Sequence, residues 1–421
     1  MGKNRIRVVW VCSFSNKKIR ARLPFDSGGC FKFLYKLLGV TFGRETDSAI
    51  WNSNAIEEME KIDDIELYVI CPIRGLGKRE IKYVENGIHY YFFREQNSNI
   101  IRFVFHQLFT KYSSRYKTNR RVIRRFINEI HPEIVHVIGA ENPYYSLSLL
   151  DVPSHIPTII QLQTLLTRLV NVTKVKKEKK SFYYKGLTER EIIKKADFIG
   201  TTLDDFKQFI KSEIKPEAVF LDVGLAMAQK INLEGSKKQY DFVYFSANIA
   251  KAGEEALEAF ILAHMRNPKI TLDIVGGYDE AFKDKLDARI KDCGLDNSIS
   301  FEGRLPSHDD VIHQIRKSRF ALLPLKMDFV PNTVHEAMAN GLPVVTTITD
   351  GTPLLNEKCQ CVLLSKQNDF SAMADNMIAL LDNEHLVNDI RQNAAAYENE
   401  RFNNKSIINE WIKAYKSIVQ S

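Results

Sequence analysis

The stretch Asp328-Phe-Val-Pro-Asn-Thr-Val-His-Glu336, which continues as Ala337-Met-Ala-Asn-Gly-Leu-Pro-Val-Val345, decides the fold. The apolar run Phe320–Pro324 before it predicts a buried strand. Asn332 or Asp328 can cap a helix that includes Glu336, and Gly341 predicts where this helix ends. The following residues begin another strand. The segment therefore predicts strand, loop, helix and strand, which is typical of a parallel α/β sheet.

The start of the predicted helix has the properties of an anion site. The first amides, at Asn332 and Thr333, lack partners within the helix, and the helix dipole adds positive potential there. Glu336 lies one turn further on, where its carboxylate can accept hydrogen bonds from ribose hydroxyls. Asp328 could accept from a second set of hydroxyls. This spacing allows a nucleotide-sugar site, and it equally allows plain capping with Glu336 in solvent.

The pattern Asp-x-x-Pro-Asn-Thr-x-x-Glu-Ala-Met-Ala-x-Gly-x-Pro-Val-Val resembles the donor-site motif of retaining glycosyltransferases of the GT-B fold, in the large family four group (glycosyl transferases group 1). The resemblance implies that Glu336 binds the ribose and that Asp328 contacts the transferred sugar. It also implies that Pro331, Asn332 and Thr333 lie against the donor. The first acid is usually Glu in this family, so the Asp leaves the identity of the sugar open.

The resemblance extends to the strand–helix alternation that begins near Tyr240. It implies donor contacts after several of these strands, at Asn248, Lys251, Gly303, Arg304, Leu305 and Lys326. Relatives carry an Arg and a Lys that bind the donor phosphates; Lys251 matches the Lys, but Asn248 stands where the Arg is expected. Losing a bidentate guanidinium is not conservative, and Arg304 or Lys326 could supply the missing charge. Arg304 and Leu305 lie where the family holds the nucleobase.

A chain of 421 residues is longer than a single hydrophobic core usually accommodates, so we expect two domains. The expected fold class is α/β, with two Rossmann-like, doubly wound parallel-sheet domains facing a cleft. Residues 1–225 would bind the acceptor and residues 226–403 the donor, while a helix at 404–421 would pack back on the first domain. Six cysteines without metal-ligand spacing, and the lack of a recognisable signal peptide, lead us to expect a cytoplasmic protein without a metal.

The charge is divided unevenly along the chain. Residues 1–225 contain 37 Lys and Arg against 25 Asp and Glu, a formal charge of +12, while the remainder has 22 against 27, a charge of −5. A basic amphipathic segment lies between residues 100 and 130, and a basic, aromatic run follows at residues 174–185. Such segments can contact anionic lipid or nucleic acid, and they can equally be a solvated helix face or a surface loop. We expect no nucleic acid, and possible peripheral contact with the inner face of a membrane.

The first domain offers acceptor-side candidates after its predicted strands. The strand Ile134–Ile138 is followed by Glu141 and Asn142, and loops after parallel strands line the crevice of such sheets. In many relatives a His near the reaction centre replaces Ile138, so Glu141 becomes our catalytic candidate on this side. The remaining acceptor-side candidates are Ser27, Gly28 and Gln163.

The resemblance implies transfer of a sugar from a UDP- or GDP-sugar to an acceptor hydroxyl with retention of configuration. The catalytic candidates are Asp328, Glu336, Lys251 and Glu141. Charge on the first domain favours a lipid-linked or otherwise anionic acceptor, as in surface polysaccharide assembly (capsule, O-antigen or exopolysaccharide). Two alternatives remain. One is another GT-B enzyme, such as a nucleotide-sugar epimerase or a phosphorylase; the other is a catalytically impaired carbohydrate- or nucleic-acid-binding protein.

Overall fold

The computed structural model describes residues 5–25, 47–95, 115–168, 179–226, 237–326, 331–349, 351–401 and 403–420. The chain divides into two compact units. The first comprises Met1–Ala226 with Asn404–Ser421, and the second comprises Met227–Asn403. The expected boundary after residue 225 differs from this division by one residue.

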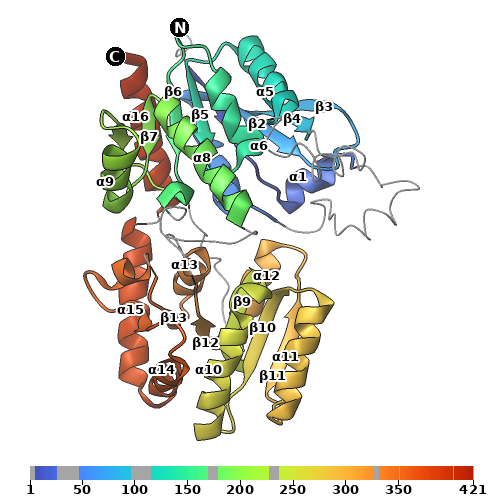
Figure 1. The fold of residues 1–421 in the computed structure, drawn as a ribbon, viewed down its shortest axis with the longest axis vertical. Helices are drawn as coiled ribbons and strands as arrows, with labels where there is room; N and C mark the ends of the chain where they lie inside the picture. The colour runs from blue at the N-terminus through green and yellow to red at the C-terminus, as the bar shows by residue number, and fades with distance from the viewer. Residues whose placement is uncertain are drawn as a thin grey trace. The chain divides into compact units, whose positions relative to one another are not determined.

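The first unit is built on an eight-stranded sheet with the order β3-β4-β2-β1-β5-β6-β7-β8 (Figure 1). Neighbouring strands are parallel except for β3 and β4, which are antiparallel. The strands are β1 (Ile6–Val11), β2 (Ile65–Ile73), β3 (Glu80–Glu85), β4 (Ile88–Arg94), β5 (Ile134–Ile138), β6 (Thr158–Gln161), β7 (Phe198–Gly200) and β8 (Val219–Leu221). The chain reverses direction across the sheet between β1 and β5, so the carboxyl ends of these two strands mark a topological switch point.

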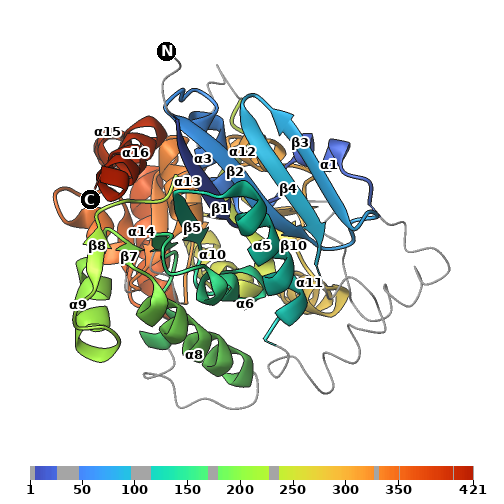
Figure 2. The same ribbon diagram turned by 90° about the horizontal axis from the view of Figure 1, so that it is seen from above.

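Helices cover both faces of this sheet (Figure 2). The helices are α1 (Lys17–Arg22), α3 (Ile50–Met59), α5 (Lys117–Ile130), α6 (Pro143–Ser146), the 3-10 helix η4 (Leu147–Asp151), α8 (Lys179–Lys195), α9 (Asp204–Glu213) and α16 (Asn404–Gln420). On one face α5, α6, η4 and α8 pack against one another, while α3 and α16 pack together on the other. The central strand β5 is buried along its whole length, because both faces of the sheet are covered there.

The C-terminal helix α16 belongs to the first unit. Its apolar side chains recur at helical spacing and are buried: Ile407, Ile408, Trp411, Ile412, Tyr415 and Ile418. Trp411 Nε1 donates a hydrogen bond to the carbonyl of Gly224 (2.9 Å), and its ring meets Trp10 edge-on. Residues at the two ends of the chain therefore share one core.

The second unit has a six-stranded, fully parallel sheet with the order β11-β10-β9-β12-β13-β14. The strands are β9 (Tyr240–Asn248), β10 (Leu272–Gly277), β11 (Ile299–Gly303), β12 (Ser318–Leu323), β13 (Val344–Thr347) and β14 (Leu363–Ser365). The helices are η5 (Ile249–Lys251), α10 (Gly253–Arg266), α11 (Glu280–Asp292), α12 (His308–Ile315), α13 (Asn332–Ala339), η6 (Thr352–Asn356), α14 (Phe370–Asp382) and α15 (Glu384–Arg401). Here the switch point lies between β9 and β12.

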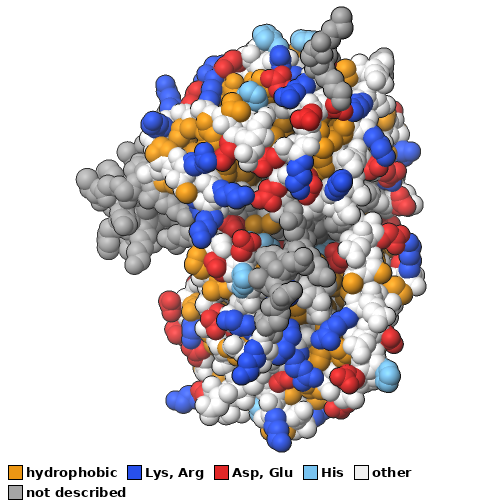
Figure 3. Space-filling model, turned by 180° about the vertical axis from the view of Figure 1, so that it is seen from behind, with side chains coloured by type: hydrophobic (Ala, Val, Ile, Leu, Met, Phe, Trp, Pro, Cys, Tyr) orange, Lys and Arg blue, Asp and Glu red, His pale blue; other side chains and the backbone are white. Residues whose placement is uncertain are grey.

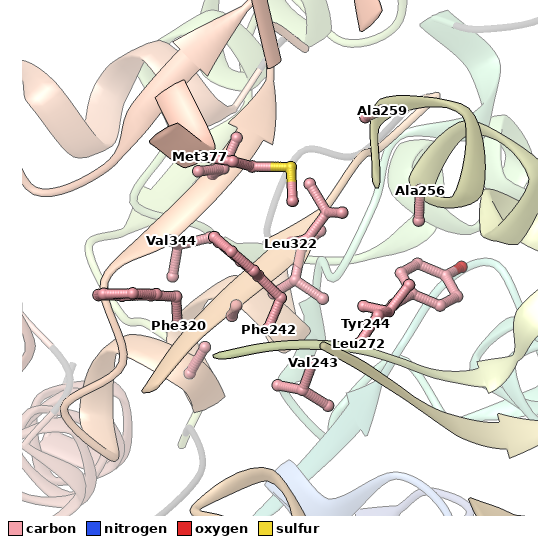
Figure 4. Close-up of a cluster of buried hydrophobic side chains, with 14 of the residues drawn as sticks. Phe242, Val243, Tyr244, Ala256, Ala259, Leu272, Phe320, Leu322, Val344 and Met377 are labelled. Atoms are coloured by element: carbon pink, nitrogen blue, oxygen red, sulfur yellow. The ribbon is translucent and has the colours of Figure 1, made fainter. Parts of the chain in front are cut away.

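A single apolar core holds the second unit together (Figure 4). Phe242 on β9 and Phe320 on β12 lie with ring centroids 5.3 Å apart, in the same cluster as Val344 of β13 and Met377 of α14. Helix α10 packs against α14, and α13 packs against α15. This packing fixes the strands whose carboxyl ends carry the candidate site.

The motif helix begins at Asn332, one residue earlier than a cap at Asn332 predicts and three residues later than a cap at Asp328 predicts. Of the two predicted caps, Asn332 is the first helical residue and Asp328 lies outside the described residues, while Pro331 occupies the N-cap position. Because proline has no side-chain acceptor, it leaves the first amides uncapped by its own side chain. The helix ends near Gly341, whose φ of +75° suits glycine, as predicted.

Candidate functional site

The donor-side candidates lie at one edge of the second sheet. Asn248 is the last residue of β9, Gly303 is the last residue of β11, and Lys326 follows β12. Because all strands of this sheet are parallel, their carboxyl ends share an edge, and the switch point between β9 and β12 is where ligands bind in such sheets. Asp328 lies in the segment 327–330, outside the described residues.

Helix α13 presents its amino end at this edge. No side chain among the described residues caps the helix, and Asn332 and Thr333 are partly exposed. The helix itself is firmly held: His335 is buried, and its Nδ1 atom lies 2.7 Å from Oε1 of Glu398 on α15. Tyr397 stacks on the same imidazole ring. The amides at the start of α13 are thus held in place by contacts on its far side.

Glu336 lies one turn into α13 and has 15% of its side chain exposed. Burial raises the pKa of this carboxyl to about 8. Its Oε1 atom lies 3.7 Å from Nε2 of His308, the first residue of α12. A nearly buried carboxyl at a ligand-binding edge can accept hydrogen bonds from hydroxyl groups and can exchange a proton near neutral pH.

The two lysines at this edge differ in their surroundings. Lys251 ends η5, is exposed, and has no carboxylate partner in the described part of the chain. Lys326 forms an ion pair with Glu255 of α10, with Nζ and Oε1 2.6 Å apart. A small pocket beside this pair is lined by Ala252, Pro324, Thr347 and neighbouring residues. Of the two lysines, Lys251 retains a charge that no carboxylate of the described residues offsets.

Arg304 follows β11 and extends across the ends of β10 and β9. Its Nη2 atom donates to the carbonyl of Ala247 (3.2 Å), next to Asn248. The guanidinium packs against Gly277, where an added Cβ would lie 2.6 Å from Nη2. Leu305, which was grouped with Arg304 as a nucleobase contact, packs partly against the apolar core. The structure thus directs Arg304 toward β9 and Leu305 toward the interior.

The acceptor-side candidates belong to the first unit and lie at the carboxyl ends of β5 and β6. Oε1 of Glu141 accepts a hydrogen bond from Nδ2 of Asn142 (2.6 Å). With the Gln163 amide assigned to satisfy its neighbours, Gln163 Nε2 donates to the same oxygen (2.9 Å), and Gln163 accepts from Trp51 Nε1 (2.8 Å). Glu141, Asn142 and Gln163 therefore form one network, whereas Ser27 and Gly28 lie outside the described residues.

Glu141 is an unusual carboxyl within this network. Burial raises its pKa to about 7, which the charge of Lys185 opposes only in part. Its Oε2 atom is buried and has no hydrogen-bond partner among the described residues. A second buried acid, Glu189, accepts from the amides of Leu166 and Thr167 and so fixes the loop after β6. The arrangement can hold a proton on Glu141 at neutral pH.

Three residues of these two groups escaped the sequence analysis: His308 beside Glu336, Glu255 beside Lys326, and Trp51 beside Gln163. His308 had a local signal. Ser307 and Asp310 form a capping box, which places His308 at the start of a helix directly after a strand. Glu255 and Trp51 had none, because their partners lie 71 and 112 residues away in the sequence.

Residues 228–397 match the family model described as glycosyl transferases group 1, and they lie within the second unit. A curated relative, an uncharacterized glycosyltransferase of Haemophilus influenzae, is 26% identical over 162 residues. This alignment covers 38% of the present chain and 44% of the relative, so less than half of that protein's length is matched.

Two solved structures resemble the chain over nearly its whole length. Sucrose-phosphate synthase from Thermosynechococcus elongatus has a TM-score of 0.67 at 14% identity, covering 98% of this chain and 99% of that one. An alpha,alpha-trehalose-phosphate synthase (UDP-forming) from Burkholderia vietnamiensis has a TM-score of 0.64 at 10% identity, covering 98% and 100%. Similarity at such low identity concerns the fold, and it confirms the predicted α/β class. The chain therefore has the GT-B fold, and residues 228–397 of its second unit are similar to glycosyl transferases group 1.

Proposed function

We propose that this protein is a retaining glycosyltransferase that transfers a sugar from a nucleoside-diphosphate sugar to an acceptor hydroxyl. One observation carries the proposal: the start of α13, Glu336 and Lys251 all belong to the switch-point edge of a domain that matches the group 1 model. Among the described residues, no side chain caps this helix start and no carboxylate pairs with Lys251. The two structural neighbours, a sucrose-phosphate synthase and a UDP-forming trehalose-phosphate synthase, support a sugar nucleotide as donor.

In the proposed reaction the bond between the anomeric carbon and the phosphate oxygen breaks, and the acceptor oxygen bonds to that carbon on the same face. The acceptor proton passes to the leaving phosphate oxygen. Negative charge grows on the diphosphate in the transition state, so fixed positive groups accelerate the step. Lys251 and the amides of Asn332 and Thr333 would supply that charge, which makes a divalent metal unnecessary in this proposal.

The two acidic residues of the motif would position the donor. Glu336 would bind the ribose hydroxyls, and Asp328 would contact the transferred sugar. We propose a UDP- or GDP-sugar as the donor. The motif accounts for the ribose and the diphosphate of such a donor, and it leaves the base open. Exclusion of water from the loaded site would limit hydrolysis of the donor.

The acceptor is proposed to bind the first unit near Glu141, Asn142 and Gln163. The excess of positive charge in residues 1–225 favours an anionic, lipid-linked saccharide of surface polysaccharide assembly, met by a cytoplasmic enzyme at a membrane surface. On the face shown in Figure 3, positive and negative side chains of the first unit are interspersed. Part of the basic run at residues 174–185 lies outside the described residues. No helix in the described part of the chain is long and apolar enough to cross a membrane.

Donor turnover tests the proposal. The purified protein would be incubated with UDP- and GDP-sugars, with and without EDTA, and release of the nucleotide would be followed. We expect release from one donor at the same rate in EDTA, and NMR of the product should show the donor's anomeric configuration. An inverted product would contradict the retaining mechanism, and full loss of turnover in EDTA would contradict metal independence.

A further inference from the structure

The backbone around Arg304 sets its position, and no carboxylate of the described residues is paired with it. Its Nη2 donates to the carbonyl of Ala247 (3.2 Å), and no ion pair of Arg304 occurs among the described residues. Other exposed arginines of this unit are neutralised: Arg289 pairs with Glu258 and Arg319 with Asp241. A guanidinium has five N–H donors, so most of those on Arg304 remain available to a ligand.

Gly277 creates the room that Arg304 occupies. A Cβ at Gly277 would lie 2.6 Å from Nη2 and 2.7 Å from Nε of Arg304. Both distances are shorter than van der Waals contact, so any other residue at position 277 would displace the guanidinium. The glycine therefore lets the arginine lie flat against the end of β10.

The direction of Arg304 matters for what it can bind. Gly277 pairs with Asn248 in the register between β10 and β9, and Arg304 reaches over Gly277 to the residue before Asn248. The guanidinium thus lies at the end of β9, the strand that borders the switch point. At this edge Asn248 is uncharged and Lys326 is neutralised by Glu255.

We propose that Arg304 binds the diphosphate of the nucleotide sugar, and that it does so in place of a basic residue at position 248. This assignment rests on the proposed function, and it selects one of the two roles that the sequence left open for Arg304, the replacement of the missing charge rather than the nucleobase contact. A planar guanidinium binds phosphate oxygens through two parallel hydrogen bonds. Together with Lys251, Arg304 stabilises the leaving group from the β9–β11 side of the edge.

The test compares a ligand series rather than one ligand. Binding of a nucleoside, its monophosphate and its diphosphate would be measured by calorimetry for the wild type and Arg304→Ala. We expect Arg304→Ala to weaken binding of the diphosphate about 10- to 100-fold, as for loss of a charged hydrogen bond, and to leave the affinity for the nucleoside unchanged. Arg289→Ala, which removes an exposed arginine of α11 that pairs with Glu258 of α10, is the matched control and should bind like the wild type.

Two further variants test the geometry. Gly277→Ala should weaken binding of the diphosphate to the same extent as Arg304→Ala. The double variant should bind the diphosphate no more weakly than either single variant. Asn248→Arg in the Arg304→Ala background should restore at least part of the diphosphate affinity, because the new guanidinium starts from the residue paired with Gly277. Melting temperatures without ligand would show that each variant is folded.

The outcomes separate the two proposals. Equal weakening of nucleoside and diphosphate by Arg304→Ala would identify a base contact and overturn the assignment, while leaving the proposed donor site intact. Unchanged diphosphate binding in Arg304→Ala would also overturn it. A wild type that binds no nucleoside diphosphate at all would overturn both this assignment and the proposed function.

Discussion

Oε1 of Glu336 lies 3.7 Å from Nε2 of His308, so a buried carboxyl of α13 faces the first residue of α12. The pKa of Glu336, raised by burial to about 8, means that the free protein holds this carboxyl largely protonated at pH 7. Hydroxyl groups of a ribose donate hydrogen bonds more strongly to the ionised form. Binding of a nucleotide should therefore lower the pKa of Glu336 and release a proton.

The first prediction follows from this lowering of the Glu336 pKa on nucleotide binding. Because the bound state favours the carboxylate, nucleoside diphosphate affinity should rise as the pH increases from 6 toward 9, by about tenfold for each unit of pKa lowering. The terminal phosphate also titrates near pH 6, so the matched control is Glu336→Gln, which keeps that contribution. Calorimetry at several pH values would check this. An identical pH profile in Glu336→Gln would show that Glu336 does not meet the ligand.

The second prediction concerns the proton on Glu141. Its folded pKa of about 7 lies above the ordinary value of 4.5, so the folded state binds the proton more tightly than the unfolded chain does. Stability contributed by this group is present below pH 4.5 and is lost as the pH rises through 7. Glu141→Gln mimics the neutral acid, so the variant should not show this loss of stability at higher pH. Between pH 5 and 8, the variant should gain up to about 2–3 kcal/mol relative to the wild type in urea unfolding. The exposed Glu217→Gln should show no such trend, and parallel curves for Glu141→Gln and the wild type would contradict a raised pKa.

The third prediction concerns the attachment of α16. The hydroxyl of Tyr415 accepts from Trp10 Nε1 (2.9 Å) and lies 2.6 Å from His136 Nδ1. Tyr415→Phe would leave both ring nitrogens buried without this partner and should lower the free energy of unfolding by about 1–3 kcal/mol. Tyr183, whose side chain is largely exposed, offers the control Tyr183→Phe with little effect. Equal stability of the two variants would show that this buried network does not hold the helix.

His136 adds an acid dependence to the same network. Burial lowers the pKa of His136 to about 3, whereas its pKa in the unfolded chain is near 6.5. Below pH 6.5 the unfolded chain therefore binds a proton on His136 that the folded protein does not bind. Stability should therefore fall as the pH decreases from 6.5 toward 3. In His136→Phe this dependence should be reduced, as urea titrations at pH 4 and 7 would show. A variant as acid-sensitive as the wild type would mean that other groups dominate.

The fourth prediction concerns the support of α13. Glu398→Ala would remove the buried partner of His335 and should cost about 1–3 kcal/mol in stability, with weaker nucleotide binding because the donor helix loosens. Glu398→Gln can still accept from the imidazole and should be milder. Glu400→Ala, two residues further on and in an exposed ion pair with Lys358, is the control and should change neither property measurably. Unaltered nucleotide binding in Glu398→Ala would show that the His335–Glu398 pair does not affect the proposed donor site.

The sequence predicted those features whose signals are local. The hairpin at Asn86-Gly87 formed with positive φ at both residues, the motif helix ended near Gly341, and the apolar spacing of α16 matched its buried face. These features follow from backbone preferences and periodicity within a few residues. The strand-end position of the donor candidates also followed, because loops after parallel strands share an edge.

Contacts between distant residues could not be predicted in the same way. Trp10 and Tyr415 lie 405 positions apart, and no pattern in either segment points to the other. The pairing of Lys326 with Glu255 is similar: both charges are visible in the sequence, but only the fold shows that one neutralises the other. The sequence leaves two roles open for Arg304, a nucleobase contact or a replacement for the missing positive charge, because its direction depends on the space left by Gly277.

The proposed glycosyl transfer depends most on a nucleotide site that requires Glu336 and no metal. The most direct measurement is the melting temperature of the protein with UDP, GDP, ADP, CMP and TDP, with and without EDTA, beside the variant Glu336→Ala. A ligand that binds only the folded state raises the melting temperature. We predict a higher melting temperature with one nucleotide, a shift that persists in EDTA and disappears in Glu336→Ala. No shift with any nucleotide at millimolar concentration would contradict the donor site, and with it the proposed glycosyl transfer.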